Sequence, residues 1–257
     1  MIEEDFLEAA ADFPEPFRLW MRDELPSSHD EAMRLAHQGA AEGAIILVER
    51  QTAGRGRRGA AWFSSPKKSL AFSLILRPQE AKALWPRLAL AAGLAVAEAI
   101  EDCGIQALVK WPNDVWIGER KVAGILVDAA EQFVIIGIGI NVNCTEFPDE
   151  IAHLATSLCQ ENGNYEISRS SVLAAIIYRL AIRRQQIDAD FPVMIAAIRQ
   201  RCALSGRRAH LSTAHGEMFG RVLGISDAGE LIFQTQDTTH HLIQAHSIQL
   251  LDEDLDD

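Results

Sequence analysis

The sequence predicts an α+β protein, in which a mixed, largely antiparallel sheet with packed helices is followed by a small all-β unit. Four apolar runs between residues 107 and 142 are joined by connections too short for crossover helices, which favours antiparallel pairing. Segments with helical spacing flank these runs. After Gly206 the pattern changes to short apolar runs separated by turn residues. We therefore predict a boundary near 204–206, with one domain over 1–204 and a second over 205–257.

The first predicted element is a helix over 30–37, where apolar residues recur on one side. Ser27 or Ser28 is expected to cap its start, and Glu31, three residues after Ser28, would complete a capping box. This helix places residues 27–29 at its N-terminal end.

Two strands and a second helix follow. The aliphatic run at 44–48 is typical of a buried strand and leads directly into a loop rich in glycine and arginine. A polar turn then precedes a strand over 70–76. Apolar residues and alanines recur at intervals of three and four over 88–100, which predicts a helix packed on the sheet, with Gly104 at its C-terminal cap.

The central strands are separated by short turns rich in Pro, Asn, Asp, Gly and charged residues. They are predicted over 107–110, 115–117, 122–128 and 133–142. The last of them is either an interior strand or a sheet edge that pairs with a second copy of the chain, which would make a homodimer.

The C-terminal part begins with two helices, predicted over 172–187 and 192–198 from their apolar spacing. Short strands then suggest a small β unit of about 50 residues, with a hairpin turn over 227–230. These strands are predicted over 210–212, 220–225, 231–234 and 241–244.

Composition indicates an ordinary globular protein without general affinity for polyanions. The chain has 257 residues, 48% of them hydrophobic, and a formal net charge of −12, so neither nucleic acid nor an anionic membrane is an expected partner. The four cysteines are widely spaced, which suggests neither a zinc ribbon nor a disulfide framework. The acidic N-terminus does not resemble a secretory signal, and Pro86, Arg87 and Glu98 interrupt the most apolar stretch. A cytoplasmic location is expected.

Residues 54–59 read Gly-Arg-Gly-Arg-Arg-Gly, an unusual concentration of guanidinium groups in an acidic chain. Glycines let backbone N–H groups approach a ligand, and arginines match phosphate or carboxylate, so we expect an anion here. The loop matches the residue pattern of a dinucleotide-binding fingerprint, but Pro66 breaks the helix that should follow such a fingerprint. The loop does not match the Walker A pattern either. The plainer alternative is a solvated basic hairpin tip.

Three further segments carry polar residues among apolar ones. Lys110-Trp111-Pro112-Asn113-Asp114 ends a strand and reads either as a site or as an ordinary turn. Lys121 opens the next strand, where a solvated lysine is the common case, but Gly124 within that strand marks a close approach of ligand or backbone. Asn141 ends an apolar run containing two glycines and needs a hydrogen-bond partner, which a packed strand or a polar ligand would supply.

Taken together and in this order, the segments at 49–59, 110–114, 120–126 and 137–141 resemble the signature of biotin protein ligases. The resemblance covers residues 27–143 well and implies a class II synthetase-like, biotin/lipoate ligase fold. The terminal β unit resembles that family's small SH3-like β-barrel more weakly. Enzymes of this family join biotin to ATP, giving biotinyl-5′-AMP and pyrophosphate. They then pass the biotinyl group to one lysine of a biotin carboxyl carrier domain.

The resemblance also assigns residue roles. It implies catalytic roles for Lys121, Arg57 and Arg55, whose charges would offset the repulsion between a carboxylate and an α-phosphate. Biotin contacts are implied for Ser27, Ser28, His29, Gln51, Gly54, Arg55, Arg57, Lys121 and Gly124. Nucleotide contacts are implied for Arg57, Arg58, Lys110, Trp111, Asn113, Asp114, Lys121 and Asn141. Mg²⁺ is expected to arrive with ATP; the sequence identifies no metal ligand, and no tightly bound metal is predicted.

The sequence departs from the family pattern in several places. Ser27-Ser28-His29 stands where the family usually has Ser-Thr-Asn, so an imidazole replaces an amide. Ala60 replaces an arginine, and Lys67-Lys68-Ser69 replaces a segment rich in Pro and Gly; Lys67 or Lys68 could supply the missing charge. Only about 25 residues precede the serine pair, too few for the winged helix-turn-helix of some relatives, so no DNA binding is expected.

Three other functions are compatible with parts of the sequence. A lipoate or octanoate ligase would keep the fold and change the acid, although the glycine-arginine loop favours biotin. A non-catalytic protein that binds a nucleotide or an acyl group is less expected because Arg57 and Lys121 are both present. A nucleic-acid-binding protein is disfavoured because the sequence has no wider basic surface or aromatic stacking stripe.

Overall fold

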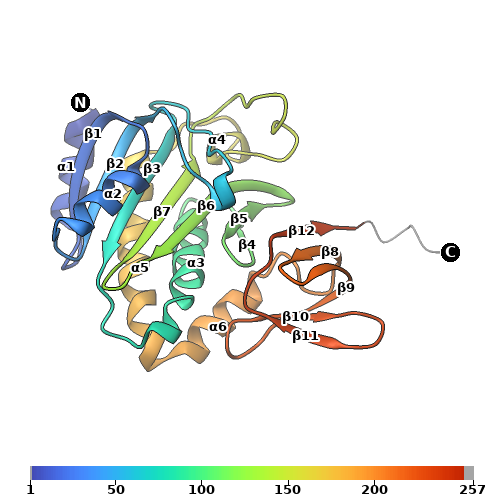
Figure 1. The fold of residues 1–257 in the computed structure, drawn as a ribbon. Helices are drawn as coiled ribbons and strands as arrows, with labels where there is room; N and C mark the ends of the chain where they lie inside the picture. The colour runs from blue at the N-terminus through green and yellow to red at the C-terminus, as the bar shows by residue number, and fades with distance from the viewer. Residues whose placement is uncertain (1, 252–257) are drawn as a thin grey trace.

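The computed structural model describes residues 2–251 and contains a seven-stranded sheet in its larger unit (Figure 1). The strand order is β1-β2-β3-β7-β6-β5-β4. β1 and β2 are parallel, whereas the other neighbouring strands of this sheet are antiparallel, which confirms the predicted mixed sheet. The strands are β1 (Arg18–Leu25), β2 (Ala44–Gln51), β3 (Ser69–Leu76), β4 (Leu108–Lys110), β5 (Asp114–Ile117), β6 (Arg120–Ala129) and β7 (Val134–Asn141).

β7 is an interior strand, with hydrogen-bonded neighbours β3 and β6 on its two sides. The alternative in which this strand forms a sheet edge and pairs with a second copy is therefore wrong. The edges of this sheet are β1 and β4. Because β7 is covered on both faces, it reads as a continuous apolar run interrupted only by glycines.

The two faces of the sheet belong to two hydrophobic clusters, because successive side chains of a strand point to opposite sides. The larger cluster contains Phe72 and Ile138 and packs under α3 and α5. The smaller one contains Ile75 and Ile135 and packs under α2. The helices are α1 (Ile2–Ala11), α2 (Ser28–His37), α3 (Arg87–Glu101), α4 (Leu158–Glu161), α5 (Arg169–Ala189) and α6 (Phe191–Gln200).

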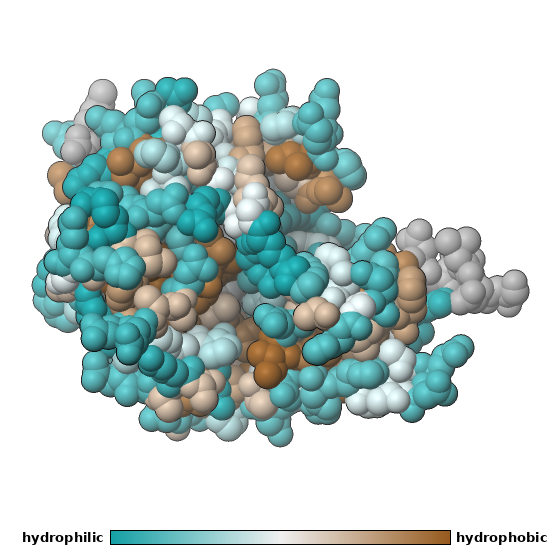
Figure 2. All heavy atoms as spheres, viewed as in Figure 1, coloured by the Kyte–Doolittle hydropathy of each residue, from teal (hydrophilic) through white to brown (hydrophobic). Residues whose placement is uncertain are grey.

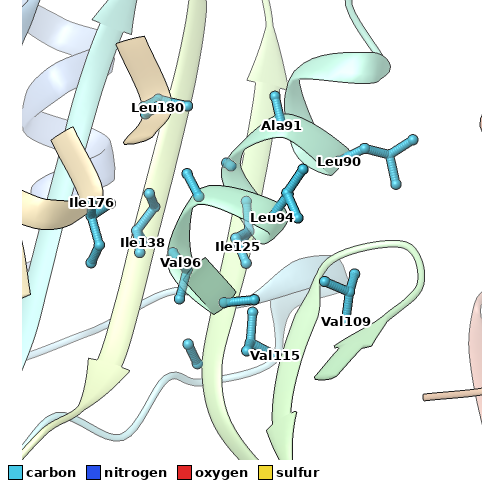
Figure 3. Packing of buried hydrophobic residues seen from close by; sticks show 14 of the residues in the cluster. Leu90, Ala91, Leu94, Val96, Val109, Val115, Ile125, Ile138, Ile176 and Leu180 are labelled. Atoms are coloured by element: carbon cyan, nitrogen blue, oxygen red, sulfur yellow. The ribbon is translucent and has the colours of Figure 1, made fainter. Parts of the chain in front are cut away.

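α3 lies at the centre of the larger cluster, and its many alanines allow close approach to the sheet and to α5. Figure 3 shows Leu94 of α3 and Ile176 of α5 close to Ile125 and Ile138 of the sheet. Within residues 2–251, none of the helices combines the length and the apolar character needed to span a bilayer.

Two N-terminal elements, α1 and β1, were not expected from the sequence. β1 reads Arg-Leu-Trp-Met-Arg-Asp-Glu-Leu, and its charged residues give no clean alternation because it is a largely exposed edge strand. Its parallel pairing with β2 places it in the sheet. α1 is acidic, but Phe6 within it is buried against the larger cluster.

The N-terminal cap of α2 is Ser27, whose side chain accepts from the backbone N–H groups of His29 and Asp30. The expected capping box between Ser28 and Glu31 is wrong. Ser28 is already the first helical residue, and the Glu31 carboxylate binds Arg34 instead.

The C-terminal unit is a five-stranded antiparallel sheet in the order β11-β10-β9-β8-β12. The expected turn over 227–230 is confirmed between β9 and β10, where the Ser226 N–H donates to the Glu230 carbonyl. The likeness to an SH3-like barrel and the division at 204/205 stay predictions. The strands are β8 (Arg208–Thr213), β9 (Gly216–Ile225), β10 (Leu231–Gln234), β11 (Thr239–Leu242) and β12 (Ser247–Leu250).

The β9–β10 turn docks onto the larger unit. The buried Trp111 indole donates from Nε1 to the Gly229 carbonyl over 3.1 Å. Gly229 itself has a φ of +88°, and a Cβ there would lie 2.7 Å from a methyl group of Leu90 in α3. Glycine is therefore required both by the backbone conformation and by the close packing.

Candidate functional site

The α2 face of the sheet carries a small cavity between the glycine-arginine loop and the ends of α2 and β2. Its free volume is about 50 Å³. The sequence-predicted residues that line it are Ser27, Ser28, His29, Gln51, Arg55, Arg57, Asn113, Lys121 and Gly124. Residues that the sequence prediction left out also line it, namely Gly56, Trp62, Phe72, Ser73, Ile125, Leu126, Gly137, Ile138 and Gly139.

Strand register builds the floor of this cavity. Ser73 of β3 pairs with Gly137 of β7, and Gly139 pairs with Gly124 of β6. Directly paired residues of antiparallel strands point to the same face, so three glycines leave this part of the sheet without side chains. The two glycines in 137–139 were the sequence signal for this floor.

The indole of Trp62 fills the space above these glycines. A Cβ on Gly139 would lie 2.3 Å from its Cε2, and one on Gly124 would lie 3.0 Å from its Cζ3. The Trp62 Nε1 is buried and has no partner among residues 2–251. The free volume of about 50 Å³ is below the roughly 300–1,000 Å³ that is usual for small-molecule pockets, because the indole occupies much of the space above the glycines.

One end of the cavity is polar and buried. The backbone N–H of Ser28 donates to Gln51 Oε1 over 2.8 Å, and the hydroxyls of Ser28 and Ser73 are 2.9 Å apart. His29 Nε2 lies 2.9 Å from Asp128 Oδ2. The side chains of Ser28, His29 and Ser73 are all buried, so a ligand here must replace water with hydrogen bonds of its own.

The other end carries the cations. Lys121 Nζ lies 2.7 Å from Asp114 Oδ1 and 5.6 Å from the centre of the Trp62 ring. The backbone of Lys121 is fixed by hydrogen bonds with Leu154 and Thr156, so the segment that follows β7 holds this end of β6. The ammonium is partly exposed and available to an anion.

Arg57 lines the same cavity as Lys121 and bridges two parts of the molecule. Its Nη1 donates to Asn113 Oδ1 over 2.8 Å, and its Nη2 donates to the carbonyl of Ala245 over 3.1 Å. Burial lowers the pKa of Arg57 from its ordinary value, although a guanidinium keeps its charge in a protein.

The loop over 54–61 is a closed hairpin. Arg55 bridges Ala61 through the backbone, and its side chain pairs with Asp30 at the start of α2. A Cβ on Gly54 would lie 2.6 Å from the carbonyl oxygen of Trp62, so this glycine permits the hairpin to close and does not line the cavity. Arg58 has a φ of +56° and is exposed, outside the cavity lining.

Several predicted nucleotide-binding residues lie outside this lining. Trp111 faces the C-terminal unit, as described above. The Asn141 amide N–H donates to the Thr156 carbonyl over 3.0 Å, whereas its buried Oδ1 has no hydrogen-bond partner among the described residues. Lys110 lies 4.3 Å from the centre of the Trp116 ring, and burial lowers its pKa. Asp114 lies behind the lining, paired with Lys121.

Within residues 2–251, no three His, Cys, Asp or Glu side chains gather into a group that could hold a metal ion. The side-chain oxygens of Asn113 and Asp114, both predicted to contact the nucleotide, already face Arg57 and Lys121.

A second, more apolar groove of about 450 Å³ lies beside Arg57 and Asn113, where the sheet meets the C-terminal unit. Trp85, Ile125 and the exposed Ile243 line part of it. Figure 2 shows hydrophobic side chains gathered on this face near the junction of the two units.

Comparison with known proteins relates this architecture to one family. Residues 25–142 match the biotin/lipoate A/B protein ligase family. The bifunctional ligase/repressor BirA of Bacillus spizizenii is 38% identical over 225 residues, which cover 84% of this chain and 69% of that protein. The biotin–[acetyl-CoA-carboxylase] ligase of Paracoccus denitrificans is 32% identical over 219 residues, covering 81% of this chain and 90% of that protein.

The fold gives the same relationship. The biotin protein ligase of Aquifex aeolicus, solved in complex with biotin and ATP, superposes with a TM-score of 0.83 at 31% identity. The superposition covers 91% of this chain and 99% of that protein. With relatives of this identity and coverage, the chain belongs to the biotin/lipoate A/B protein ligase family.

Proposed function

We propose that this protein is an ATP-dependent biotin–[acetyl-CoA-carboxylase] ligase. It activates biotin as biotinyl-5′-AMP and transfers the biotinyl group to a lysine of a biotin carboxyl carrier domain. Membership of the family and the ligase names of its relatives support this function.

The observation that carries the proposal is the division of the cavity into a buried polar end and a cationic end. Ser28, Ser73 and His29 lie at the first, and Lys121 and Arg57 lie at the second. Biotin has a matching division, with a polar ureido ring at one end and a carboxylate at the other. The glycine floor and Trp62 lie among these groups and offer an apolar surface to the rest of the ligand.

The same division favours biotin over lipoate or octanoate. Neither of those acids carries a hydrogen-bonding head group, so either would leave the buried polar groups of Ser28, His29 and Ser73 unpaired. A site built to hydrogen-bond its substrate discriminates strongly against an analogue that lacks the matching group.

In the first step, a biotin carboxylate oxygen attacks the α-phosphorus of ATP. A new P–O bond forms, the bond between the α-phosphorus and the oxygen that bridges it to the β-phosphorus breaks, and pyrophosphate leaves. The carboxylate and the phosphates repel each other, so fixed positive charge is needed where they meet. We assign that charge to Lys121 and Arg57, which lie at the cationic end of the cavity.

In the second step, the amine of the carrier lysine attacks the carbonyl carbon of the mixed anhydride. An amide forms, the attacking nitrogen gives up a proton to solvent, and AMP leaves with the electron pair of the broken C–O bond. Before this attack the anhydride must be kept from water. Arg57 joins the loop to Asn113 and to Ala245, and we propose that these contacts help to hold the loop over the intermediate.

Mg²⁺ is proposed to enter with ATP, bound mainly by the phosphate oxygens, as is usual for this ion. The Asp114 carboxylate is of the ligand class that Mg²⁺ prefers, and it lies 2.7 Å from the Lys121 ammonium that we place at the phosphates. It is therefore the side chain we would expect to approach the metal.

The proposed protein partner is the carrier domain. The formal net charge of −12 supports the expectation that nucleic acid is not a partner. A homodimer and a cytoplasmic location stay predictions.

Release of pyrophosphate tests the function directly. The purified protein is incubated with MgATP and biotin, lipoate or octanoate, and a carrier domain is then added. We expect pyrophosphate with biotin alone, followed by one biotinyl label per carrier. Pyrophosphate release with lipoate but not with biotin would show that the enzyme is a lipoate ligase. No pyrophosphate release with any of the three acids would favour the non-catalytic alternative.

A further inference from the structure

His29 is a buried histidine in which one ring nitrogen has a hydrogen-bond partner among the described residues and the other has none. It is the second residue of α2, its side chain is 3% exposed, and it lines the cavity. Its Nε2 lies 2.9 Å from Asp128 Oδ2, whereas its Nδ1 has no partner among the described residues. A buried polar atom without a partner is uncommon and calls for a ligand or a water.

Asp128 determines which nitrogen carries the proton. Its hydrogen bond with His29 holds the pKa of the Asp128 carboxyl below the ordinary value, so the group is an ionised acceptor at neutral pH. Nε2 must then be the protonated nitrogen. In a neutral imidazole this leaves Nδ1 as an acceptor that faces a ligand in the cavity.

The surroundings of Nδ1 define the chemistry of that ligand. Nδ1 faces Gly137, where an added Cβ would lie 2.8 Å from Nδ1 and 3.4 Å from the hydroxyl oxygen of Ser73. That hydroxyl is 2.9 Å from the Ser28 hydroxyl. Two hydroxyls that share one hydrogen bond retain one hydrogen for a third group. A donor and an acceptor thus lie side by side, complementary to the adjacent N–H and C=O of a cyclic urea.

We propose that His29 is a specificity-determining residue whose Nδ1 accepts an N–H of the ureido ring of biotin, and that Asp128 is the positioning residue that fixes its tautomer. This inference rests on the proposed biotin ligase function and identifies the side-chain group that recognises the ureido ring of biotin. It gives a role to the imidazole at a position where an amide is usual in the family.

Two substitutions at residue 29 separate the two ring nitrogens. His29→Gln places an amide near the former Nε2, so the contact with Asp128 survives but the acceptor at Nδ1 is lost. His29→Asn places a carbonyl oxygen near the former Nδ1, so the acceptor survives. We expect His29→Gln to weaken biotin binding by roughly 10- to 100-fold and His29→Asn to restore most of the affinity. His37→Gln, at the exposed end of the same helix, is the matched control and should bind as wild type.

Asp128→Asn tests the positioning role without removing the ring. The new amide can donate to Nε2, which would move the ring proton to Nδ1 and convert the acceptor into a donor. Biotin affinity should then fall as far as in His29→Gln, and combining the two substitutions should add little. A purely structural role for Asp128 would instead lower thermal stability and leave the affinity of the folded fraction unchanged.

The protonation state itself is read by ¹⁵N NMR of the histidine rings in the full-length protein, without and with saturating biotin. We expect an unprotonated Nδ1 at His29 that shifts on binding, and a protonated Nδ1 in Asp128→Asn. A protonated Nδ1 in the free wild type, or an Nδ1 signal that biotin leaves unchanged, would overturn the inference.

Failure of the inference is distinguishable from failure of the proposed function. If wild type releases pyrophosphate with biotin while His29→Gln and Asp128→Asn bind biotin equally well, only the role of His29 is wrong. If wild type neither binds biotin nor releases pyrophosphate with it, the biotin assignment is wrong and this inference with it.

Discussion

The indole of Trp62 occupies the place that a side chain at residue 139 would need, since a Cβ on Gly139 would lie 2.3 Å from Trp62 Cε2. The strand and the loop after the arginine hairpin are thus fitted to each other. The free cavity of about 50 Å³ is what remains beside that indole.

Gly139→Ala should therefore disturb the site more than the fold. The methyl group would push Trp62 away, and we expect biotin affinity to fall by about tenfold or more, because close-packed positions tolerate added volume poorly. Gly93→Ala is the control, since its Cβ would meet only Val109 Cγ1 at 3.8 Å within a helix. The biotin affinity of the two variants is measured by calorimetric titration, and the environment of the indole is followed by Trp fluorescence. Equal affinities in the two variants would contradict the fitted contact.

Lys121→Ala should impair adenylate formation while leaving the fold intact. A lost charge-assisted hydrogen bond of about 1.5–3 kcal/mol predicts a rate lower by roughly 10- to 150-fold. Lys82→Ala, which removes an ammonium near the Trp85 ring in the second groove, is the control. Pyrophosphate release and thermal unfolding are compared for both. An unchanged rate in Lys121→Ala would remove Lys121 from the catalytic residues.

Arg57→Gly should let the adenylate escape, because it removes the hydrogen bonds to Asn113 and Ala245 that hold the loop. Free adenylate would label lysines of a bystander protein, detected by blotting for biotin. The neighbouring substitution Arg58→Gly is the control, since Arg58 is exposed and its positive φ suits glycine. If labelling stays selective in Arg57→Gly, the retaining role is wrong.

Lys110→Met should stabilise the protein near neutral pH while reducing adenylation. Burial holds the Lys110 pKa below its ordinary value of 10.5, so the folded state disfavours the ammonium. In the wild type, the free energy of unfolding should rise as the pH increases from the pKa of Lys110 in the folded state toward 10.5, its ordinary value. The difference in this free energy between Lys110→Met and the wild type should shrink over the same pH interval. Urea unfolding at a series of pH values measures the difference. An advantage independent of pH would mean that packing, and not charge, is responsible.

Trp111→Phe should loosen the junction between the two units. It removes the hydrogen bond from Nε1 to the Gly229 carbonyl, and we expect a loss of about 1 kcal/mol in the free energy of unfolding. Trp116→Phe is the control, because the Trp116 Nε1 has no hydrogen-bond partner among the described residues. Denaturant unfolding of the two variants is compared, and equal losses would count against a specific role for the junction.

The sequence predicted those parts of the fold that local spacing determines. Short connections between 107 and 142 left antiparallel pairing as the simple solution, and the structure confirms it. β1 escaped prediction because its charged residues acquire strand geometry only by pairing with β2. The intrinsic β-propensity of the residues does not predict such long-range strand pairing.

The same limit applies to the cavity. The motif residues were identifiable one by one, but the face on which each lies depends on register. Asn113 therefore reaches the cavity while Trp111, two residues before it, faces the C-terminal unit. The sequence analysis did not identify Trp62 as a site residue, because its importance arises from strands that are distant in the chain.

The junction has a consequence for how such an enzyme can evolve. The turn over 110–114 carries Asn113 toward the cavity and Trp111 toward Gly229, while Arg57 contacts both Asn113 and Ala245. Substitutions in the C-terminal unit can thus be transmitted to the reacting groups without touching them. We expect some inactivating variants to map there, in a part of the molecule that looks dispensable when its surface is viewed alone.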